Sequence, residues 1–316
     1  MTGEGRTRLW RPGRRVHTDL TVGAHRRGPG DPTHRRVSEH DWWRATRVST
    51  GTALLHLLVR GPEVAATAWG KGAEEVLDQV PELLGAADDP SDFTPAHPLV
   101  AEAVRRHPDL RLGRSAAVGE ALFPACLEQV VTSTEAFAAF RTLVRQHGEP
   151  APGPTDDPES PAHAMMVPPT ARGWSRIPSW DYLRAGVEQR RSEPLVTAAR
   201  RGPALERTLL MGSQDADRAL QSLPRIGPWT SAETRQRAHG DPDAWSVGDY
   251  HVGDAISFAL TGQRLGDDGA LELLEPYAGH RFRAQVLIGL VAGFPPRRGP
   301  RRTLPTHTPR ATRGRA

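Results

Sequence analysis

The residues with the clearest chemical potential lie in one short segment, Gly248-Asp249-Tyr250-His251, which precedes an apolar stretch typical of a helix. An aspartate at a helix start usually caps the helix, because its carboxylate accepts hydrogen bonds from the first backbone N–H groups. The same position favours the ionised carboxylate and fixes its place, since the helix N-terminus attracts negative charge. The pattern therefore predicts that Asp249 is a helix cap that can also act as a charged catalytic group.

A second segment with chemical potential, Leu223–Thr230, ends twenty residues or so before this turn and reads Leu-Pro-Arg-Ile-Gly-Pro-Trp-Thr. An amphipathic helix is predicted to end near Leu223 and a second helix to start near Thr230, with a tight Pro/Gly turn between them. The free N–H groups of such a hairpin can hold one phosphate. Taken alone, the turn is typical of an ordinary helix connection. Its spacing to Asp249 favours a phosphate grip beside a carboxylate.

Together these segments resemble the helix-hairpin-helix-Gly/Pro-Asp superfamily of DNA glycosylases, and within it the DNA-3-methyladenine glycosylase II family. The hairpin, helix start and essential aspartate of that family match Leu223–Gly227, Trp229–Ala232 and Asp249. Resemblance extends over residues 115–292 and, in pattern, over residues 8–114. It implies an α+β fold, in which an N-terminal antiparallel-sheet domain is followed by an all-α helix-hairpin-helix glycosylase domain.

The resemblance implies a monofunctional DNA glycosylase that flips out and excises alkylated, 3-methyladenine-like bases in base-excision repair. The target nucleotide must leave the stack, because its C1′ cannot be reached inside the duplex. Asp249 would stabilise the positive charge that develops on the sugar and orient or deprotonate the attacking water. An alkylated base that is already cationic leaves with little acid catalysis.

Further site residues follow from the resemblance. Trp229 and Tyr250 are expected in the base pocket, where aromatic faces attract cationic rings. Glu233 stands where several relatives carry an aromatic pocket residue, and is interpreted either as a base contact or as a solvated helix residue. The residues expected to contact DNA lie in the hairpin and in a loop beside the lesion, with Val130 either a wedge in the duplex or a core residue: Arg225, Ile226, Gly227, Thr230, Gln129 and Val130. Arg225 replaces the first glycine of the family hairpin, which predicts backbone strain or a phosphate contact.

Neither a cofactor nor a metal is expected. Bifunctional relatives use a lysine directly after the hairpin to form a Schiff base, and here that position is Trp229. The single lysine, Lys71, lies in the other predicted domain. The single cysteine, Cys126, excludes an intrachain disulfide and a four-cysteine cluster. His251 has no second ligand at metal-site spacing.

Two other functions remain open. One is a non-catalytic DNA lesion-binding protein, which would keep the hairpin but has no use for an aspartate at this spacing. The other is a glycosylase for an oxidised or deaminated base, since a match of fold does not determine the pocket.

The elements that must position these residues change character along the chain. Strands are predicted at Val16–Val22, Trp42–Val48 and Thr52–Val59, followed by a helix at Ala73–Leu84. From residue 97 the apolar spacing predicts helices, interrupted by a proline-rich loop at 148–163: Leu99–Arg106, Glu120–Thr132, Thr134–His147, Trp180–Arg190, Glu193–Gly202, Gln214–Ser222, Thr230–His239, Asp254–Leu260, Gly269–Leu274 and His280–Val291. The predicted organisation is a disordered basic arm (1–7), an α+β domain (8–114), the glycosylase domain (115–294) and a disordered basic tail (295–316).

Charge is unevenly distributed over the 316 residues. The net charge is +4, but residues 1–36 hold nine arginines against three acids and residues 295–316 hold seven arginines and no acid. Basic ends attract phosphates without base specificity. No stretch is apolar over the length of a membrane span, and no secretory signal is recognisable. The expected partner is double-stranded DNA with damaged bases, bound by a cytoplasmic, nucleoid-associated monomer.

Overall fold

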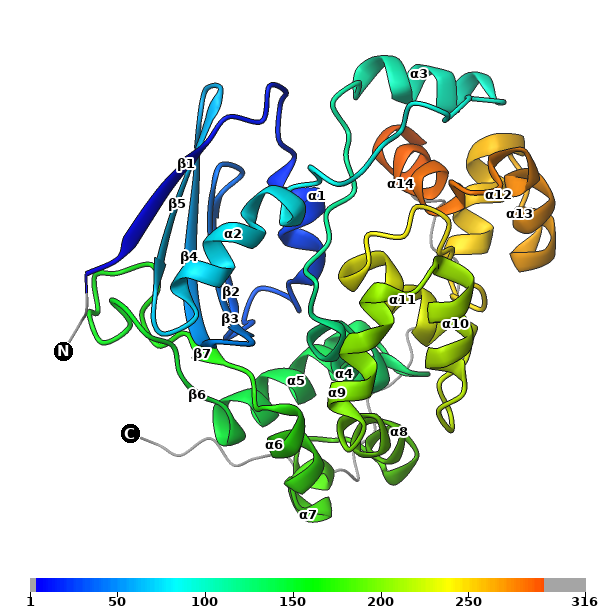
Figure 1. Cartoon of the computed structure of the whole chain (residues 1–316). Helices are drawn as coiled ribbons and strands as arrows, with labels where there is room; N and C mark the ends of the chain where they lie inside the picture. The colour runs from blue at the N-terminus through cyan, green and yellow to red at the C-terminus, as the bar shows by residue number, and fades with distance from the viewer. Residues whose placement is uncertain (1–3, 293–316) are drawn as a thin grey trace.

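The N-terminal part of the chain forms a five-stranded antiparallel sheet in a computed structural model that describes residues 4–292 (Figure 1). Its strands are β1 (Arg6–Trp10), β2 (His34–Ser38), β3 (Asp41–Val48), β4 (Gly51–Arg60) and β5 (Glu63–Trp69), in the spatial order β1-β5-β4-β3-β2. Helices follow the sheet in sequence. The predicted α+β class is confirmed.

Both faces of the sheet are covered, because successive side chains of a strand point to opposite faces. Trp42 of β3 belongs to the core beneath helix α2 (Ala73–Leu83). Its neighbour Trp43 stacks on Trp69 at a centroid distance of 5.6 Å, on the face covered by the segment that includes β6 (Glu149–Pro150) and β7 (Met166–Val167). The proline-rich stretch predicted as a loop therefore contributes a cover for the sheet.

Two predictions for the first forty residues are wrong. The expected strand Val16–Val22 is a short helix, α1 (Thr18–Thr21), followed by the 3₁₀ turn η1 (Gly23–His25). The expected disordered arm is ordered at Arg6 and Thr7, which pair with β5. Strand β1 is almost wholly exposed, so it lacks the alternation of apolar and polar residues that predicts a strand. The predicted tail, 295–316, lies outside the described residues.

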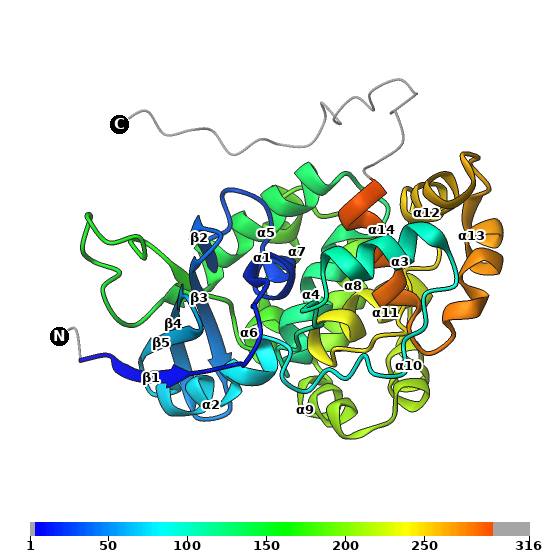
Figure 2. The same cartoon turned by 90° about the horizontal axis from the view of Figure 1, so that it is seen from above.

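From α3 onward the helices contribute to two apolar cores, and Figure 2 shows the arrangement of these helices from above. Their bounds are α3 (Pro98–Arg106), α4 (Val118–Glu128), α5 (Ser133–His147), α6 (Ala171–Arg176), α7 (Ser179–Arg184), α8 (Gln189–Ala199), α9 (Gly202–Glu206), η2 (Arg207–Leu210), α10 (Ser213–Gln221), α11 (Pro228–Ala238), α12 (Val252–Thr261), α13 (Gly266–Leu274), η3 (Glu275–Tyr277) and α14 (Arg281–Ala292). The first core joins α4 and α5 to helices α6–α11. The second joins α3 to α12, α13 and α14.

Helix α3 corrects the predicted domain boundary at residue 114. Val100 and Ala103 are buried in the same core as Ile256 and Leu287, so α3 packs with the C-terminal helices and not with the sheet. The chain therefore crosses to the helical part, and the sheet domain ends before α3. Among residues 4–292, no helix is both long enough and apolar enough to span a bilayer.

Two histidines, the buried His34 and the partly buried His239, predict how stability depends on pH. Burial, with a smaller contribution from Arg44, lowers the pKa of His34 to about 3, and burial lowers the pKa of His239 to about 4. An unfolded histidine titrates near 6.5, so the unfolded chain binds more protons below that pH. Stability is therefore complete above about pH 6.5 and falls as the pH falls; at pH 5 we expect a loss of roughly 2 kcal/mol for each histidine.

Urea denaturation at pH 7.5 and pH 5 measures this loss. His34→Asn should flatten the pH dependence, whereas His163→Asn, which changes an exposed histidine, should leave it as in the wild type. The same change of the unfolding free energy between pH 7.5 and pH 5 in the wild type, His34→Asn and His163→Asn would contradict the assignment to His34.

Candidate active site

The two cores meet where a helical hairpin faces the start of α12. Helix α10 ends at Gln221, the turn closes with the N–H of Ile226 donating to the carbonyl of Leu223 (3.1 Å), and α11 begins at Pro228. Ile226 is buried in the first core and anchors the turn. Because the first N–H groups of a helix have no partner within it, the start of α11 can offer them to an anion.

Asp249 lies opposite the hairpin, with both carboxylate oxygens held. Its Oδ1 accepts hydrogen bonds from the backbone N–H of His251 (2.9 Å) and of Val252 (3.1 Å), which caps α12. Its Oδ2 accepts a hydrogen bond from the indole Nε1 of Trp229 (3.1 Å). The carboxylate is thus fixed between two helices that belong to different cores, and it remains partly exposed.

The loop that carries Asp249 is pinned to α11 by polar side chains. Gln236 donates to the carbonyl of Ala244 (2.6 Å) and to the hydroxyl of Ser246 (2.8 Å). The Ser246 hydroxyl donates in turn to Glu233 Oε1 (2.7 Å), and the Ser246 carbonyl accepts the N–H of Asp249 (3.1 Å). Gly248, at φ +83°, makes the turn that follows. These contacts determine where Asp249 stands.

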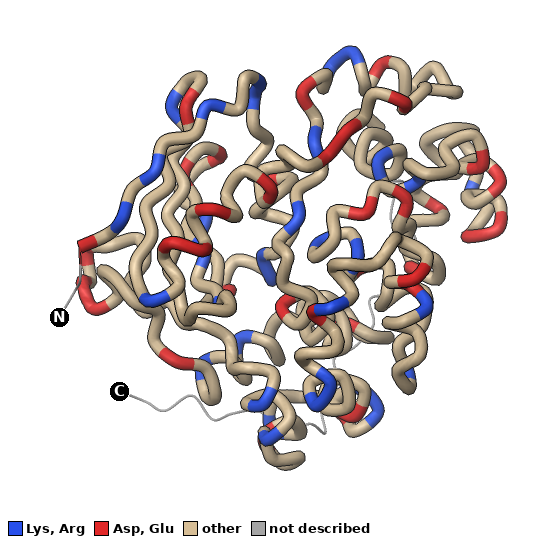
Figure 3. The backbone as a smooth tube through the Cα atoms, in the orientation of Figure 1, with Lys and Arg blue, Asp and Glu red and all other residues tan. Residues whose placement is uncertain are grey.

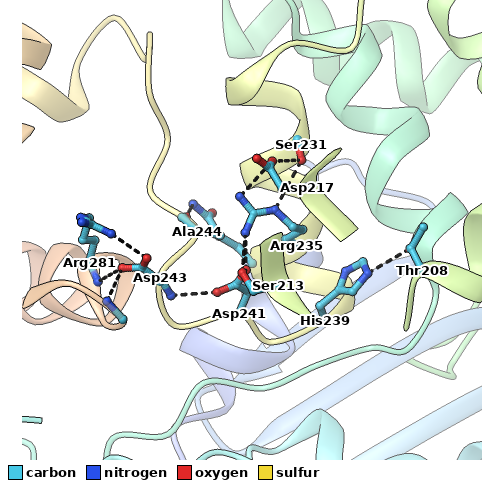
Figure 4. A network of polar contacts seen from close by, with 12 residues as sticks. Thr208, Ser213, Asp217, Ser231, Arg235, His239, Asp241, Asp243, Ala244 and Arg281 are labelled. Carbon is cyan, nitrogen blue, oxygen red and sulfur yellow. Dashed lines mark hydrogen bonds and ion pairs between the residues drawn. The ribbon is translucent and has the colours of Figure 1, made fainter. Parts of the chain in front are cut away.

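A buried ionic network holds the other end of the same loop (Figure 4). Arg235 of α11 pairs with Asp217 of α10 (3.1 Å) and with Asp241. Asp241 also accepts hydrogen bonds from the Ser213 hydroxyl and from the N–H of Asp243. Asp243 then pairs with Arg281 at the start of α14 (2.6 Å). The network ties the hairpin and the loop to the second core, and sequence patterns did not predict it.

The interpretation of Glu233 as a solvated helix residue is wrong. Its side chain is largely buried, and Arg237 donates to its Oε2 (2.7 Å). Burial opposes ionisation, but the Arg237 guanidinium and the Ser246 hydroxyl outweigh it and hold the pKa of Glu233 below its usual value. Glu233 is therefore a buried anion that supports the Asp249 loop.

Trp229 and Tyr250, the two aromatic residues expected in the base pocket, differ in exposure. Trp229 is half-buried beside Asp249, but Tyr250 is 89% exposed and contacts the ring of His251 edge-on at 4.8 Å. Among the described residues, no group of His, Cys, Asp and Glu side chains is arranged to hold a metal ion.

The loop between α4 and α5 lies against the hairpin. The Gln129 side-chain amide donates to the carbonyl of Arg225 (3.0 Å) and to the Thr230 hydroxyl (2.9 Å). Val130 is 70% exposed and has φ +54°, a conformation that costs a β-branched residue energy. The alternative that Val130 is a core residue is therefore wrong. Ile226 and Thr230 are buried, so only their backbone can face a ligand of the hairpin.

Figure 3 shows basic and acidic positions interspersed through the sheet and the helices. Seven arginines of the chain lie in residues 293–316, so the described residues carry a net −3 of the total +4. Charge alone does not mark a nucleic-acid-binding face on residues 4–292.

Arg225 adopts φ +64° at the position where the family hairpin has glycine. Arg225→Gly should relieve this strain and raise the free energy of unfolding by about 0.5–1 kcal/mol. If Arg225 also contacts a phosphate, the same change should reduce the salt dependence of DNA binding by about one counterion. Urea denaturation measures the change in unfolding free energy, and DNA-binding titrations at several salt concentrations measure the change in salt dependence. A lower free energy of unfolding for Arg225→Gly than for the wild type would contradict the proposed backbone strain.

Comparisons with known proteins support the fold and give no sequence relative. No family model matches the chain, and no curated protein is detectably similar to it. Solved structures share the fold: a 3-methyladenine DNA glycosylase from Archaeoglobus fulgidus is 18% identical with a TM-score of 0.69, over 89% of this chain and 96% of that one. An 8-oxoguanine glycosylase/lyase from Clostridium acetobutylicum, in its apo-form, is 13% identical with a TM-score of 0.69, over 92% and 98%. The chain has the fold of the helix-hairpin-helix DNA glycosylases.

Proposed function

We propose that this protein is a monofunctional DNA glycosylase that hydrolyses the N-glycosidic bond of a flipped, damaged base with Asp249. The observation that carries the proposal is the position of the Asp249 carboxylate opposite the hairpin. The start of α12 and the Trp229 indole hold the carboxylate there. The fold shared with glycosylases of known structure supports it.

In the proposed reaction the hairpin binds a backbone phosphate of the duplex through its free N–H groups. Val130, exposed on the neighbouring loop, occupies the gap that the flipped nucleotide leaves. The bond from C1′ to the base then breaks, and the base takes the electron pair. The Asp249 carboxylate stabilises the positive charge on the sugar and accepts a proton from the water whose oxygen bonds to C1′.

The proposal excludes strand cleavage through a lysine Schiff base. Trp229 occupies the position directly after the hairpin, and the single lysine of the chain, Lys71, lies between β5 and α2. The product should therefore be an abasic site in an uncut strand.

Alkylated purines are the first substrate class we propose, because a cationic base is a good leaving group and Trp229 offers one aromatic face. A glycosylase for an oxidised or deaminated base is the second candidate. It is favoured by the surroundings of Glu233, which are ionic where an aromatic residue was expected. A non-catalytic lesion-binding protein would bind the same duplexes and release nothing.

The test uses purified protein with methylated duplex DNA and with duplexes that carry one 8-oxoguanine or one hypoxanthine. We expect release of methylated purines, and strands that break only after alkali. Breakage before alkali would contradict the monofunctional mechanism, and release of 8-oxoguanine or hypoxanthine alone would favour the second candidate.

A further inference from the structure

The turn that carries Asp249, residues 246–251, has little side-chain packing to hold it in place. Val247 is 40% exposed and Tyr250 is 89% exposed, and a Cβ atom added to Gly248 would meet nothing beyond its chain neighbours within 4 Å. An exposed segment of this kind moves easily unless hydrogen bonds fix its backbone. The position of the Asp249 carboxylate therefore depends on the hydrogen bonds that the turn makes with its surroundings.

One of these hydrogen bonds reaches a helix that the site has not yet involved. The backbone N–H of Gly248 donates to Oδ2 of Asp267 (2.5 Å), and Asp267 lies in the first turn of α13. The N–H of the next residue, Asp249, donates to the carbonyl of Ser246 (3.1 Å), whose hydroxyl is bonded to Gln236 of α11. Two successive N–H groups of the turn are thus anchored, one toward α13 and the other toward α11.

The start of α13 packs closely against the first turn of α12, beside which it lies (Figure 1, Figure 2). The N–H of Gly266 donates to Oδ1 of Asp254 (3.1 Å). A Cβ atom at Gly253 would lie 2.5 Å from Oδ1 of Asp267 and 2.9 Å from the carbonyl of Gly266, so the absence of a side chain at Gly253 permits this approach. Asp267 is therefore held against α12, the helix that Asp249 caps.

We propose that Asp267 is a positioning residue for the reaction: its carboxylate holds the Gly248 N–H and thereby sets the place of Asp249 beneath the sugar. The inference rests on the proposed glycosylase function, and it assigns to Asp267 a role that acts through Asp249. A misplacement of about 1 Å at the reacting groups can cost about 100-fold in rate. Because the hairpin, and not this turn, is expected to bind the phosphate, loss of the hydrogen bond should affect the chemical step more than DNA affinity.

Single-turnover base release from damaged duplex DNA, measured beside DNA affinity, tests the proposal. Asp267→Ala removes the acceptor, and we expect its rate of base release to fall by about 10-fold, as for one lost hydrogen bond to a charged group, with DNA affinity nearly unchanged. Asp267→Asn keeps an amide oxygen that can accept the Gly248 N–H, so it should retain most of the wild-type rate. If Asp267→Asn is as slow as Asp267→Ala, the charge and not the hydrogen bond matters, and the inference is overturned.

Asp268→Ala is the matched control. Asp268 follows Asp267 in the first turn of α13, and its side chain is exposed. Both acids place a negative charge at the start of the helix, so the two alanine variants lose the same kind of interaction with the helix dipole. We expect Asp268→Ala to release base at the wild-type rate. An equal fall in both alanine variants, or a wild-type rate in Asp267→Ala, would overturn the inference.

A spectroscopic readout separates this inference from the proposed function. The indole Nε1–H of Trp229 donates to Oδ2 of Asp249 (3.1 Å), so its proton resonance reports where the carboxylate stands. In protein with isotope-labelled tryptophan, the Trp229 signal is found among the eight indole signals by its absence in Trp229→Phe. We expect this signal to shift in Asp267→Ala and to keep its position in Asp268→Ala.

The two readouts fail in different ways. An unshifted Trp229 signal in Asp267→Ala would overturn the positioning role of Asp267 while the glycosylase function stands. A wild type that releases no base from any damaged duplex would overturn the proposed function, and the catalytic part of this inference with it, even if the Trp229 signal shifts as expected.

Discussion

Asp249→Asn is expected to slow base release by at least about 100-fold while leaving DNA affinity nearly unchanged. Asparagine keeps the size of the side chain and is an equally good helix cap, so its amide oxygen can still accept the N–H groups of His251 and Val252. What it loses is the negative charge beneath the sugar and the ability to take a proton. Single-turnover rates with excess enzyme measure the effect on the chemical step.

The control for this prediction is a binding titration with the same duplex at the same salt concentration. A variant that binds as the wild type does but is slow in release assigns Asp249 to chemistry. If Asp249→Asn releases base at close to the wild-type rate, another group must perform the reaction, and the site described here is not the active site.

The second large effect concerns stability. Asp241→Ala removes one of the two carboxylates that pair with Arg235, and it also strips Ser213 and the N–H of Asp243 of their partner. The buried Arg235 then keeps only the partly exposed Asp217 of its two carboxylates, and buried donors lose their acceptor, so we expect the free energy of unfolding to fall by about 3 kcal/mol. Because the network fixes the loop that carries Asp249, base release should also slow in the remaining folded protein.

Urea denaturation measures the change, with Asp215→Asn as the control. Asp215 pairs with Arg218 on the surface of α10, where both side chains are exposed, and such a pair contributes about 0–1 kcal/mol. Similar losses in the two variants would show that the Arg235 network is no more important than a surface ion pair.

The sequence predicted what depends on local rules. The cap at Asp249, the hairpin turn and most helices follow from spacing, turn residues and apolar periodicity, all of which act over a few residues. The strand β1 was missed because its residues are exposed, and Val16–Val22 was misassigned because its β-rich composition suggested a strand where the chain forms a short helix.

Contacts between distant segments could not be predicted in this way. Nothing local shows that Glu128 pairs with Arg27 or that Glu120 accepts three hydrogen bonds from strand β3. Likewise, Arg235 and Asp241 look like surface charges until folding buries them together. The expected role of Tyr250 in a base pocket came from resemblance and stays a prediction; its side chain is 89% exposed.

The most direct test of the central claim is to count free bases and abasic sites that the wild-type protein forms in the same damaged duplex. We predict equal numbers of the two, with the strand intact until alkali is added, because hydrolysis at C1′ releases one base for each abasic site. Tight binding of the damaged duplex without either product would contradict the account and would identify the protein as a lesion-binding protein.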